Sequence, residues 1–498
     1  MIEDVSFTEK NDGTDFTWRW EKSELPVLVE PKIPSMKSNL LENGVGELPV
    51  DYWLSMFTEE NLNILTIETN HYLNSKPRST KVPVITNGEM RRFIGILIYM
   101  SIVKVPKYRN YFNGPNRQES VSNAMKISRF EQILNNLHMN DNDLQPKRGD
   151  ARFDTLYKFR PLLSNFERAF DEGAQPEPHV FVEEMLAPAK GRVPGRIYMP
   201  NKPYKRGFQL WSLAGARSGY VKKFQILGDN LLQHEVVESS IGASGRVVLE
   251  LAEKMPPGTN FYFDNYFASP LLAYKLKQRG QDATCTLRGN RKSGADKFLM
   301  SEQEMRKKGR GTVDSVCCNG ILVTQWYDRK LVIVASTKYS TFPKDNVERC
   351  SSNKGTSINM KTKKWYKKLL YFFIDLCVSN AYACFKADYP EKNLDFLEFK
   401  TEVSHSLMRK IDLGPGAELD LPPPQQSADF VCDEVRLDRV DHLPSWVDGG
   451  KTSKVFGKHC KIRGCKGHTR SYCMKCKVFL CNSAVKKCYY KWHTATRS

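Results

Sequence analysis

Six cysteines and two histidines crowd the last 39 residues of this 498-residue chain, and they constrain its fold more than any other feature. A segment of that length with few apolar residues besides its cysteines is too small to bury a hydrophobic core, so cross-links must stabilise it. The first residues, MIEDVSFTEKNDG, lack the basic region and apolar run of a secretory signal. We therefore expect reduced thiols that bind metal rather than disulfides.

The ligand count fits two tetrahedral Zn2+ sites, because six thiolates and two imidazoles supply eight ligands. Zinc binding would then supply the free energy that folds the segment. The alternative is a floppy basic tail with free thiols. His459 is a further imidazole that competes with His468 for one ligand position. Which ligands share a zinc ion is left open. The eight predicted ligands are Cys460, Cys465, His468, Cys473, Cys476, Cys481, Cys488 and His493.

Positive charge is concentrated in the same segment. The chain carries 75 Lys and Arg against 56 Asp and Glu, a formal +19, and residues 451–498 supply +13 of it because they contain no acidic residue. A segment with this much positive charge is typical of proteins that bind phosphates. We therefore predict double-stranded DNA as its partner. The alternative is a zinc module that binds another protein. The expected DNA contacts are Lys461, Arg463, Lys466 and Arg470.

Changes of periodicity along the chain predict a mixed α/β protein. Apolar residues repeat at helical spacing between residues 49 and 173, and after Pro176 the period shortens to about two residues in stretches rich in β-formers. Helices and strands then alternate, which favours a mixed sheet flanked by helices. Residues 364–385 are apolar nearly all round, which predicts a core helix. The apolar run within that helix is interrupted by polar residues and falls short of the ~20 residues that a bilayer needs.

The predicted organisation has seven segments, separated by shifts in composition. They are an acidic flexible arm (1–48), a helical domain (49–173), the first part of the mixed-sheet core (174–288), an inserted loop segment (289–320), the second part of the core (321–412), an acidic Pro-rich linker (413–455) and the cysteine-rich zinc domain (456–498).

Acidic residues interrupt two of the predicted core strands. Asp264 follows the apolar strand that begins at Asn260, and Glu183 and Glu184 lie within the strand that begins at His179. Carboxylates on neighbouring strands can hold a divalent cation for phosphoryl chemistry. An Asp at a strand end is more often a turn or cap residue, so the spacing by itself supports this site only weakly.

A basic stretch follows the first of these strands and contains no acidic residue between positions 185 and 228. A solvated run of charge is the usual explanation for such a stretch. Six cations within eighteen residues, with prolines beside the acidic strands, instead favour a groove that tracks a nucleic-acid strand. These cations are Lys190, Arg192, Arg196, Lys202, Lys205 and Arg206.

The order of these motifs resembles the piggyBac transposase family over nearly the whole chain after residue 48. The matching segments are Pro49-Val-Asp-Tyr-Trp-Leu-Ser-Met-Phe-Thr, Glu68-Thr-Asn, Pro146-Lys-Arg-Gly-Asp-Ala-Arg-Phe-Asp-Thr-Leu-Tyr-Lys-Phe-Arg-Pro-Leu, Lys190-Gly-Arg, Tyr198-Met-Pro-Asn-Lys-Pro-Tyr-Lys-Arg-Gly-Phe, Phe263-Asp-Asn-Tyr-Phe-Ala-Ser, Lys363-Lys-Trp and the terminal Cys/His module. The resemblance implies an RNase H-like core, a helical dimerisation and DNA-binding domain before it, an inserted domain, and a C-terminal cross-brace zinc module that binds transposon-end DNA.

Members of that family cut and paste DNA with three aspartates and two Mg2+. The resemblance places the first aspartate at Glu183 and the second at Asp264. A Glu is one methylene longer than an Asp, which would displace a metal by ~1 Å and cost about 10²-fold in rate.

The third aspartate of the family lies in a Met-Gly-Gly-Val-Asp signature, and the resemblance finds no counterpart here. The segment that begins at Asn346 passes almost directly to Met360-Lys-Thr-Lys-Lys-Trp. Glu348 and Asp375 are the two conceivable substitutes, and we expect neither to serve. Two-metal strand cleavage needs both ions, so loss of one ligand disables it.

The sequence therefore predicts a nuclear, transposase-derived DNA-binding protein that is catalytically inactive and forms a homodimer. One alternative is an active or weakly active cut-and-paste transposase, which would use Mg2+. Another is an adaptor whose zinc module binds a host protein. No membrane partner is expected.

Overall fold

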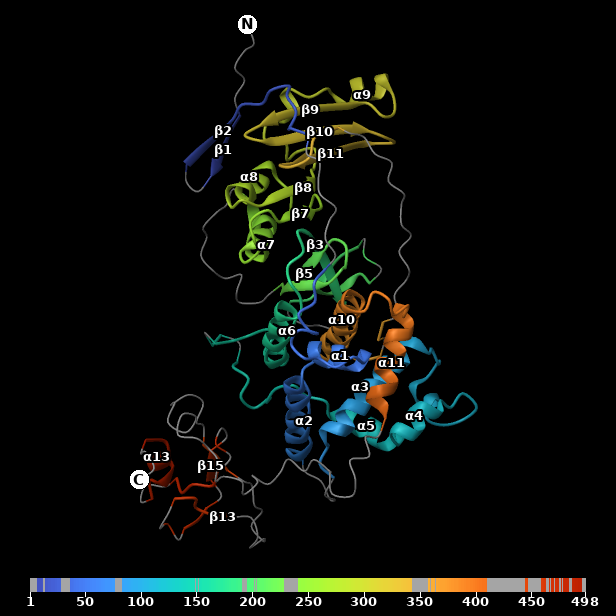
Figure 1. Ribbon diagram of the computed structural model, residues 1–498, viewed down its shortest axis with the longest axis vertical. Coiled ribbons are helices and arrows are strands. Elements are labelled where there is room, and N and C mark those ends of the chain that lie inside the picture. The colour runs from blue at the N-terminus through green and yellow to red at the C-terminus, as the bar shows by residue number, and fades with distance from the viewer. Residues whose placement is uncertain are drawn as a thin grey trace. The chain divides into compact units, whose positions relative to one another are not determined.

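The structure is a computed structural model (Figure 1), and it consists of two units, Met1–Lys410 and Ile411–Ser498, which are considered separately. The described residues of the first unit are 7–11, 14–27, 36–76, 83–147, 149–150, 152–189, 195–200, 202, 204–227, 241–342, 357–358, 360–362 and 364–409. Those of the second are 444–446, 458–462, 465, 467–469, 471–473, 476, 478–482 and 486–494.

The helical part of the first unit forms where the sequence predicts it. Glu89 and the side chain of Thr86 form a capping box that starts one of its helices, which fixes the beginning of the apolar run after residue 89. The helices are α1 (Pro49–Met56), α2 (Glu59–Asn74), α3 (Asn87–Ile102), α4 (Glu119–Ala124), α5 (Ile127–Asn136) and α6 (Arg160–Glu172), with a 3-10 turn, η1 (Tyr108–Tyr111).

Two further helices, α10 (Trp365–Asp388) and α11 (Phe396–Met408), return to this part from the C-terminal end of the unit (Figure 1). In α11 the hydroxyl of Ser404 donates to the carbonyl of Gly95 at 3.1 Å, so α11 lies close to α3. Helix α10 is long and apolar enough to cross a membrane, but 67% of its most apolar stretch is buried within the protein. The prediction of a core helix is therefore confirmed.

A nine-stranded mixed sheet forms the centre of the first unit, in the order β4-β5-β3-β7-β8-β11-β10-β9 with β6 paired to β5. Strands β3, β7 and β8 are parallel to one another, and the remaining pairs are antiparallel. The strands are β3 (His179–Pro188), β4 (Ile197–Tyr198), β5 (Arg206–Gly215), β6 (Val221–Ile226), β7 (Asn260–Phe263), β8 (Asp282–Thr286), β9 (Val313–Cys318), β10 (Ile321–Tyr327) and β11 (Leu331–Ser336).

The two faces of the sheet belong to different hydrophobic cores, because successive side chains of a strand point to opposite sides. In β3, Val180 and Val182 join one core with α7 (Gly242–Ala252) and α8 (Pro270–Gln278). Phe181 and Met185 join the other core, which contains α10 and the helical part. The mixed sheet flanked by helices is thus confirmed.

The N-terminal segment differs from the expected flexible arm. Strand β2 (Thr14–Trp18) pairs with β1 (Phe7–Asn11). Trp18 is fully buried and stacks on Trp20, with 5.2 Å between the ring centres. Glu21 then bridges to Cys317 and continues the sheet beyond its edge strand. The expectation was wrong for these residues because aromatic side chains, not acidic composition, decide where this segment lies.

The expected inserted loop is also more ordered than its composition indicated. Residues 289–320 include the 3-10 turn η3 (Ala295–Lys297), helix α9 (Glu302–Lys308) and edge strand β9. Ser301 and Glu304 form a capping box that starts α9. The Lys, Arg and Gly content of the segment concealed this local capping signal.

The C-terminal unit is built from short elements around its cysteines. These are β12 (Pro444–Trp446), β13 (Lys458–His459), β14 (His468–Thr469), β15 (Ser471–Cys473) and α13 (Cys488–Thr494). Strand β12 pairs with β15, although the sequence assigned residues 444–446 to the linker. Val478, Leu480 and Trp492 pack against the buried cysteines, so the apolar core is small and cysteine side chains form most of it.

Candidate functional site

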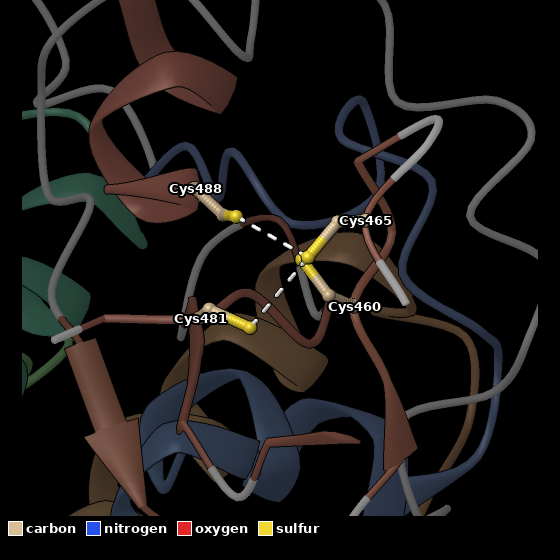
Figure 2. Close-up of side chains that lie close together, drawn as sticks. All are labelled: Cys460, Cys465, Cys481 and Cys488. Carbon is tan, nitrogen blue, oxygen red and sulfur yellow. Dashed lines mark hydrogen bonds between the residues drawn. The ribbon is translucent and has the colours of Figure 1, made fainter. Parts of the chain in front are cut away.

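Four cysteines of the C-terminal unit form a first cluster: Cys460, Cys465, Cys481 and Cys488, whose sulfur atoms all lie within 4.8 Å of one another (Figure 2). The Sγ of Cys465 is 3.9 Å from that of Cys481 and 3.6 Å from that of Cys488. A tetrahedral site with Zn–S bonds of about 2.3 Å requires sulfur atoms about 3.8 Å apart. A disulfide would bring two of them to about 2.05 Å. The cluster therefore has the dimensions of a metal site.

The thiols of this cluster differ in acidity. The backbone N–H of Gly467, followed by the thiol of Cys488, lowers the pKa of Cys465 to about 7. Burial, followed by its sulfur neighbours, raises the pKa of Cys481 to about 11 and that of Cys488 to about 12. A metal ion bound here would have to displace the protons of Cys481 and Cys488.

A second cluster joins Cys473, Cys476 and His493, all of them buried. The Nε2 of His493 lies 3.6 Å from the Sγ of Cys476, and the Sγ of Cys473 accepts the backbone N–H of Cys476 at 3.4 Å. The other ring nitrogen, Nδ1, bonds to the carbonyl of Tyr489 at 2.8 Å. That hydrogen bond orients the imidazole and leaves Nε2 available as a ligand.

The two clusters are interleaved along the chain, and they group seven of the candidate ligands whose pairing the sequence left open. The first takes Cys460, Cys465, Cys481 and Cys488, and the second takes Cys473, Cys476 and His493 from between and beyond them. Helix α13 supplies Cys488 to one and His493 to the other, so it ties the two clusters together. The Cys-x2-Cys spacing at Cys473 was the local signal that those two thiols share one site.

The eighth predicted ligand, His468, lies in β14 opposite His459 of β13. The side chain of His468 lies outside the described residues, and that of His459 is exposed. The structure therefore gathers seven of the eight predicted ligands, and the fourth position of the second cluster stays a prediction.

Glu183 and Asp264 meet at one end of the parallel strands. Val182 of β3 lies beside Phe263 of β7, so the next residue of each strand is an acid. Both acids line one open depression, whose floor includes Tyr262 and Val334. Asp264 also accepts the backbone N–H of Tyr266 at 2.9 Å, which makes it a turn residue as well. The predicted acidic pair is thus brought together.

A third carboxylate, Glu184, is electrostatically coupled to this pair. Burial raises the pKa of Glu184, the like charges of Asp264 and Glu183 add to the increase, and Lys202 opposes it. The carboxylate accepts a hydrogen bond from Gln209 at 3.0 Å. The sequence placed Glu183, Glu184 and Asp264 on neighbouring strands, and the parallel register of β3 and β7 brings Glu184 close enough to Asp264 for this coupling.

Of the two substitutes for the third acid, only Asp375 lies within the described residues, and it is engaged in an ion pair. Glu348 lies outside the described residues. Asp375 of α10 accepts the ammonium of Lys400 at 2.8 Å and the backbone N–H of Ile358 at 2.7 Å. Its pKa is raised by burial although Lys400 opposes the rise. Among the described residues, the only carboxylates that line the depression are Glu183 and Asp264.

Part of the predicted basic stretch lies beside the acids. The ammonium of Lys202 donates to the carbonyl of Glu184 at 3.0 Å, and the guanidinium of Arg206 lies 5.5 Å from the ring centre of Tyr198. Lys205 is exposed and Arg196 is partly buried next to β4. Lys190 and Arg192 lie outside the described residues, as do the side chains of Arg463, Lys466 and Arg470 in the tail, where Lys461 is half-buried.

A family model described as Transposase IS4 matches residues 48–360, which is more than half of the chain. The chain belongs to this family, in its piggyBac branch. It is 27% identical over 523 aligned residues to human piggyBac transposable element-derived protein 3, with 97% of this chain and 82% of that protein covered. Human piggyBac transposable element-derived protein 2 is 23% identical over 413 residues, with 75% of this chain and 67% of that protein covered.

A solved piggyBac transposase, in a synaptic complex with hairpin DNA, has the same fold. The TM-score is 0.61 at 19% identity, and the match covers 77% of this chain and 86% of that one. The predicted piggyBac resemblance and the predicted fold class are both confirmed.

Proposed function

We propose that this piggyBac relative binds double-stranded DNA, holds two structural zinc ions in its C-terminal unit, and does not cleave DNA. The observation that carries the proposal is the pair of interleaved ligand clusters within the most basic segment of the chain. Residues 451–498 supply +13 of the formal charge of +19. A segment with this charge neutralises DNA phosphates and releases their counterions. The piggyBac transposase of similar fold was solved with DNA.

Zinc is the metal that this donor set favours, because thiolate and imidazole ligands in tetrahedral sets are typical of structural zinc. Cys460, Cys465, Cys481 and Cys488 would hold one ion. Cys473, Cys476 and His493 would hold the other, with His468 or His459 as the fourth ligand. The ions would stabilise a unit whose apolar core is small.

The proposed loss of DNA cleavage follows from the carboxylates of the core, which do not supply the family's three aspartates. Glu183 is longer than the aspartate that the family places there, and the described residues offer Asp375 only as the partner of Lys400. Two-metal phosphoryl transfer needs ligands for both ions, so a pair of carboxylates leaves the second ion weakly held. DNA binding does not depend on these carboxylates, since phosphate contacts come from Lys and Arg.

A protein that binds DNA in this way would act in the nucleus, and the family resemblance favours a homodimer. Both are proposals that accompany the binding function. Fractionation of cells with an antibody against the chain tests the first, and sedimentation of the purified chain tests the second.

The experiment that tests binding is fluorescence anisotropy of the full chain on duplex DNA across a salt series. We expect the logarithm of the binding constant to fall linearly with the logarithm of salt concentration. Lys461→Gln should reduce the slope, and Lys126→Gln, which changes an exposed lysine of the helical part, is the control. Absence of binding, or binding that is insensitive to salt, would refute the proposal and favour a protein partner for the zinc module.

A second candidate function, an active or weakly active transposase, is favoured by one observation, the coupling of Glu184 to Asp264 and Glu183. Incubation of supercoiled transposon-end DNA with the chain and Mg2+ distinguishes the active transposase from the inactive DNA-binding protein. We expect no nicking by the wild type or by Asp264→Ala. Nicking by the wild type that Asp264→Ala abolishes would establish the enzyme, and loss of that nicking in Glu184→Gln would identify Glu184 as its third acid.

A further inference from the structure

Helices α4 and α11 lie side by side in the first unit (Figure 1), and a pocket of about 460 Å3 opens between them. Volumes of this order are typical of ligand sites. Each helix contributes residues at positions i, i+3 and i+4, which lie on one face of a helix. These residues are Ser120, Asn123 and Ala124 from α4, and His405, Met408 and the C-cap residue Arg409 from α11.

The exposed polar side chains of this pocket have no partners within the described part of the chain. Arg409 is exposed, and its guanidinium takes part in none of the salt bridges found there. The hydroxyl of Ser120 and the amide of Asn123 are exposed and make no side-chain hydrogen bond there. Three groups that can donate hydrogen bonds therefore line one pocket without a protein partner.

The imidazole of His405 adds a buried atom that is also unpaired. The ring stacks on Tyr99, with 5.7 Å between the ring centres. Its Nε2 is shielded from solvent and has no hydrogen-bond partner among the described residues. Buried polar atoms in proteins nearly always have a partner, because an unpaired one costs free energy. A ligand with hydrogen-bond acceptors would supply that partner once the ring turns toward it, in the tautomer that carries the proton on Nε2.

The chemistry of the lining selects a carboxylate. Arg409 supplies one positive charge and a planar fork of donors, which matches the two oxygens of a carboxylate. No acid lines the pocket, and the acids nearest to it along the two helices, Glu119 and Glu402, are exposed outside it. Met408 and Ala124 are buried and give the pocket an apolar wall, against which the methylene groups of an acidic side chain can pack.

The shape of the pocket favours a side chain over a free metabolite or a DNA phosphate. Ligand sites for small molecules usually enclose most of the ligand, whereas three of the lining residues here are exposed. A phosphate of duplex DNA is held between two sugars and cannot enter a recess toward a buried atom. A carboxylate at the end of a flexible glutamate side chain can.

We propose that the pocket between α4 and α11 binds the carboxylate of an acidic side chain presented by a partner protein. Arg409 pairs with the carboxylate from one helix, and Ser120 and Asn123 donate to it from the other. The site is separate from the acidic pair in the core and from the cysteine clusters, and it does not depend on DNA binding. It gives the first unit a surface of its own for a host protein.

The test follows the modification of Arg409 in the full chain by phenylglyoxal, a reagent for guanidinium groups, with mass spectrometry of the digested product. The probe is a peptide of six glutamates, and a peptide of six glutamines is its control, both at about 0.15 M salt to screen loose ionic contacts. We expect the glutamate peptide alone to slow the modification of Arg409. Arg329, an exposed arginine at the turn between β10 and β11, serves as the internal control and should react at an unchanged rate.

The variant Ser120→Ala/Asn123→Ala tests the facing helix while it leaves Arg409 in place as the reporter. The peptide concentration that halves the modification rate should rise at least about tenfold, because two hydrogen bonds to a charged group are lost. Ser406→Ala, which changes a serine of α11 outside the pocket, is the control and should behave as the wild type does. The thermal unfolding midpoint should stay the same in both variants, since neither Ser120 nor Asn123 bonds to the described protein through its side chain.

Four outcomes would overturn the proposal. The first is an equal rate at Arg409 with and without the glutamate peptide, and the second is equal slowing at Arg409 and Arg329. The third is protection by glutarate at the same carboxylate concentration as the peptide, which would make the pocket a site for free small carboxylates. The fourth is protection by duplex DNA without protection by the peptide, which would make it a phosphate contact.

Discussion

The buried pair of Lys400 and Asp375 decides whether Asp375 can act as a spare catalytic acid, and it can be tested directly. The Lys400 side chain is 1% exposed and that of Asp375 is 20% exposed, with 2.8 Å between Nζ and Oδ1. Lys400→Met keeps the length of the side chain and removes the charge. Breaking a buried pair of this kind costs about 3–5 kcal/mol. Because Asp375 keeps the backbone N–H of Ile358, we expect about 3 kcal/mol, at the lower end of that range.

The stability deficit of Lys400→Met should also change with pH, in a direction set by the pKa of Asp375. Burial already raises the pKa of Asp375 with Lys400 in place, and removal of Lys400 raises it further. An acid with a raised pKa in the folded state costs stability above that pKa, and the cost disappears as the pH falls through it. The deficit of Lys400→Met should therefore be largest at neutral pH and shrink in mild acid.

The assay is urea unfolding followed by tryptophan fluorescence at neutral and mildly acidic pH. Arg168→Met, which removes an exposed partner of Glu60, is the control and should cost at most about 1 kcal/mol. A deficit for Lys400→Met no larger than that of the control, or one that is the same at both pH values, would refute the assignment of Asp375 to a buried structural pair.

Three further outcomes are expected. A chelator should unfold the C-terminal unit with loss of its circular dichroism signal, and elemental analysis of the untreated chain should give about two zinc ions; an unchanged spectrum would contradict the metal assignment. Asp264→Ala should leave the DNA-binding constant within about twofold of the wild type, since phosphate contacts depend on cations; a large loss in anisotropy would link that acid to binding. Asn380→Ala should destabilise the first unit by about 2–3 kcal/mol in urea unfolding, because Asn380 bonds to both backbone groups of Val221 at 2.8 and 2.9 Å and its loss leaves them unpaired; Ser379→Ala on the exposed face of α10 is the control.

Local signals in the sequence were sufficient for most elements of the fold. The apolar period placed the helices between residues 49 and 173 and the core helix α10, because it depends on side chains a few positions apart. Local signals failed for Trp18, which is buried against Tyr274 far away along the chain. They also failed for β9, which pairs with the neighbouring strand β10 within a segment whose composition indicated a loop. Acidic or basic composition could not reveal either contact.

The sequence by itself determined which chemistry the protein carries: soft ligands in a basic tail, an acidic pair in the core, and the piggyBac motifs that place both. Only the tertiary structure decided how these groups combine. It interleaved the cysteines into two clusters, coupled Glu184 to Asp264 through the register of β3 and β7, and used Asp375 for a buried ion pair. It also brought polar side chains of α4 and α11 together around one pocket. Ligand type is a property of single residues, whereas pairing and charge balance depend on distances between residues that the fold alone makes short.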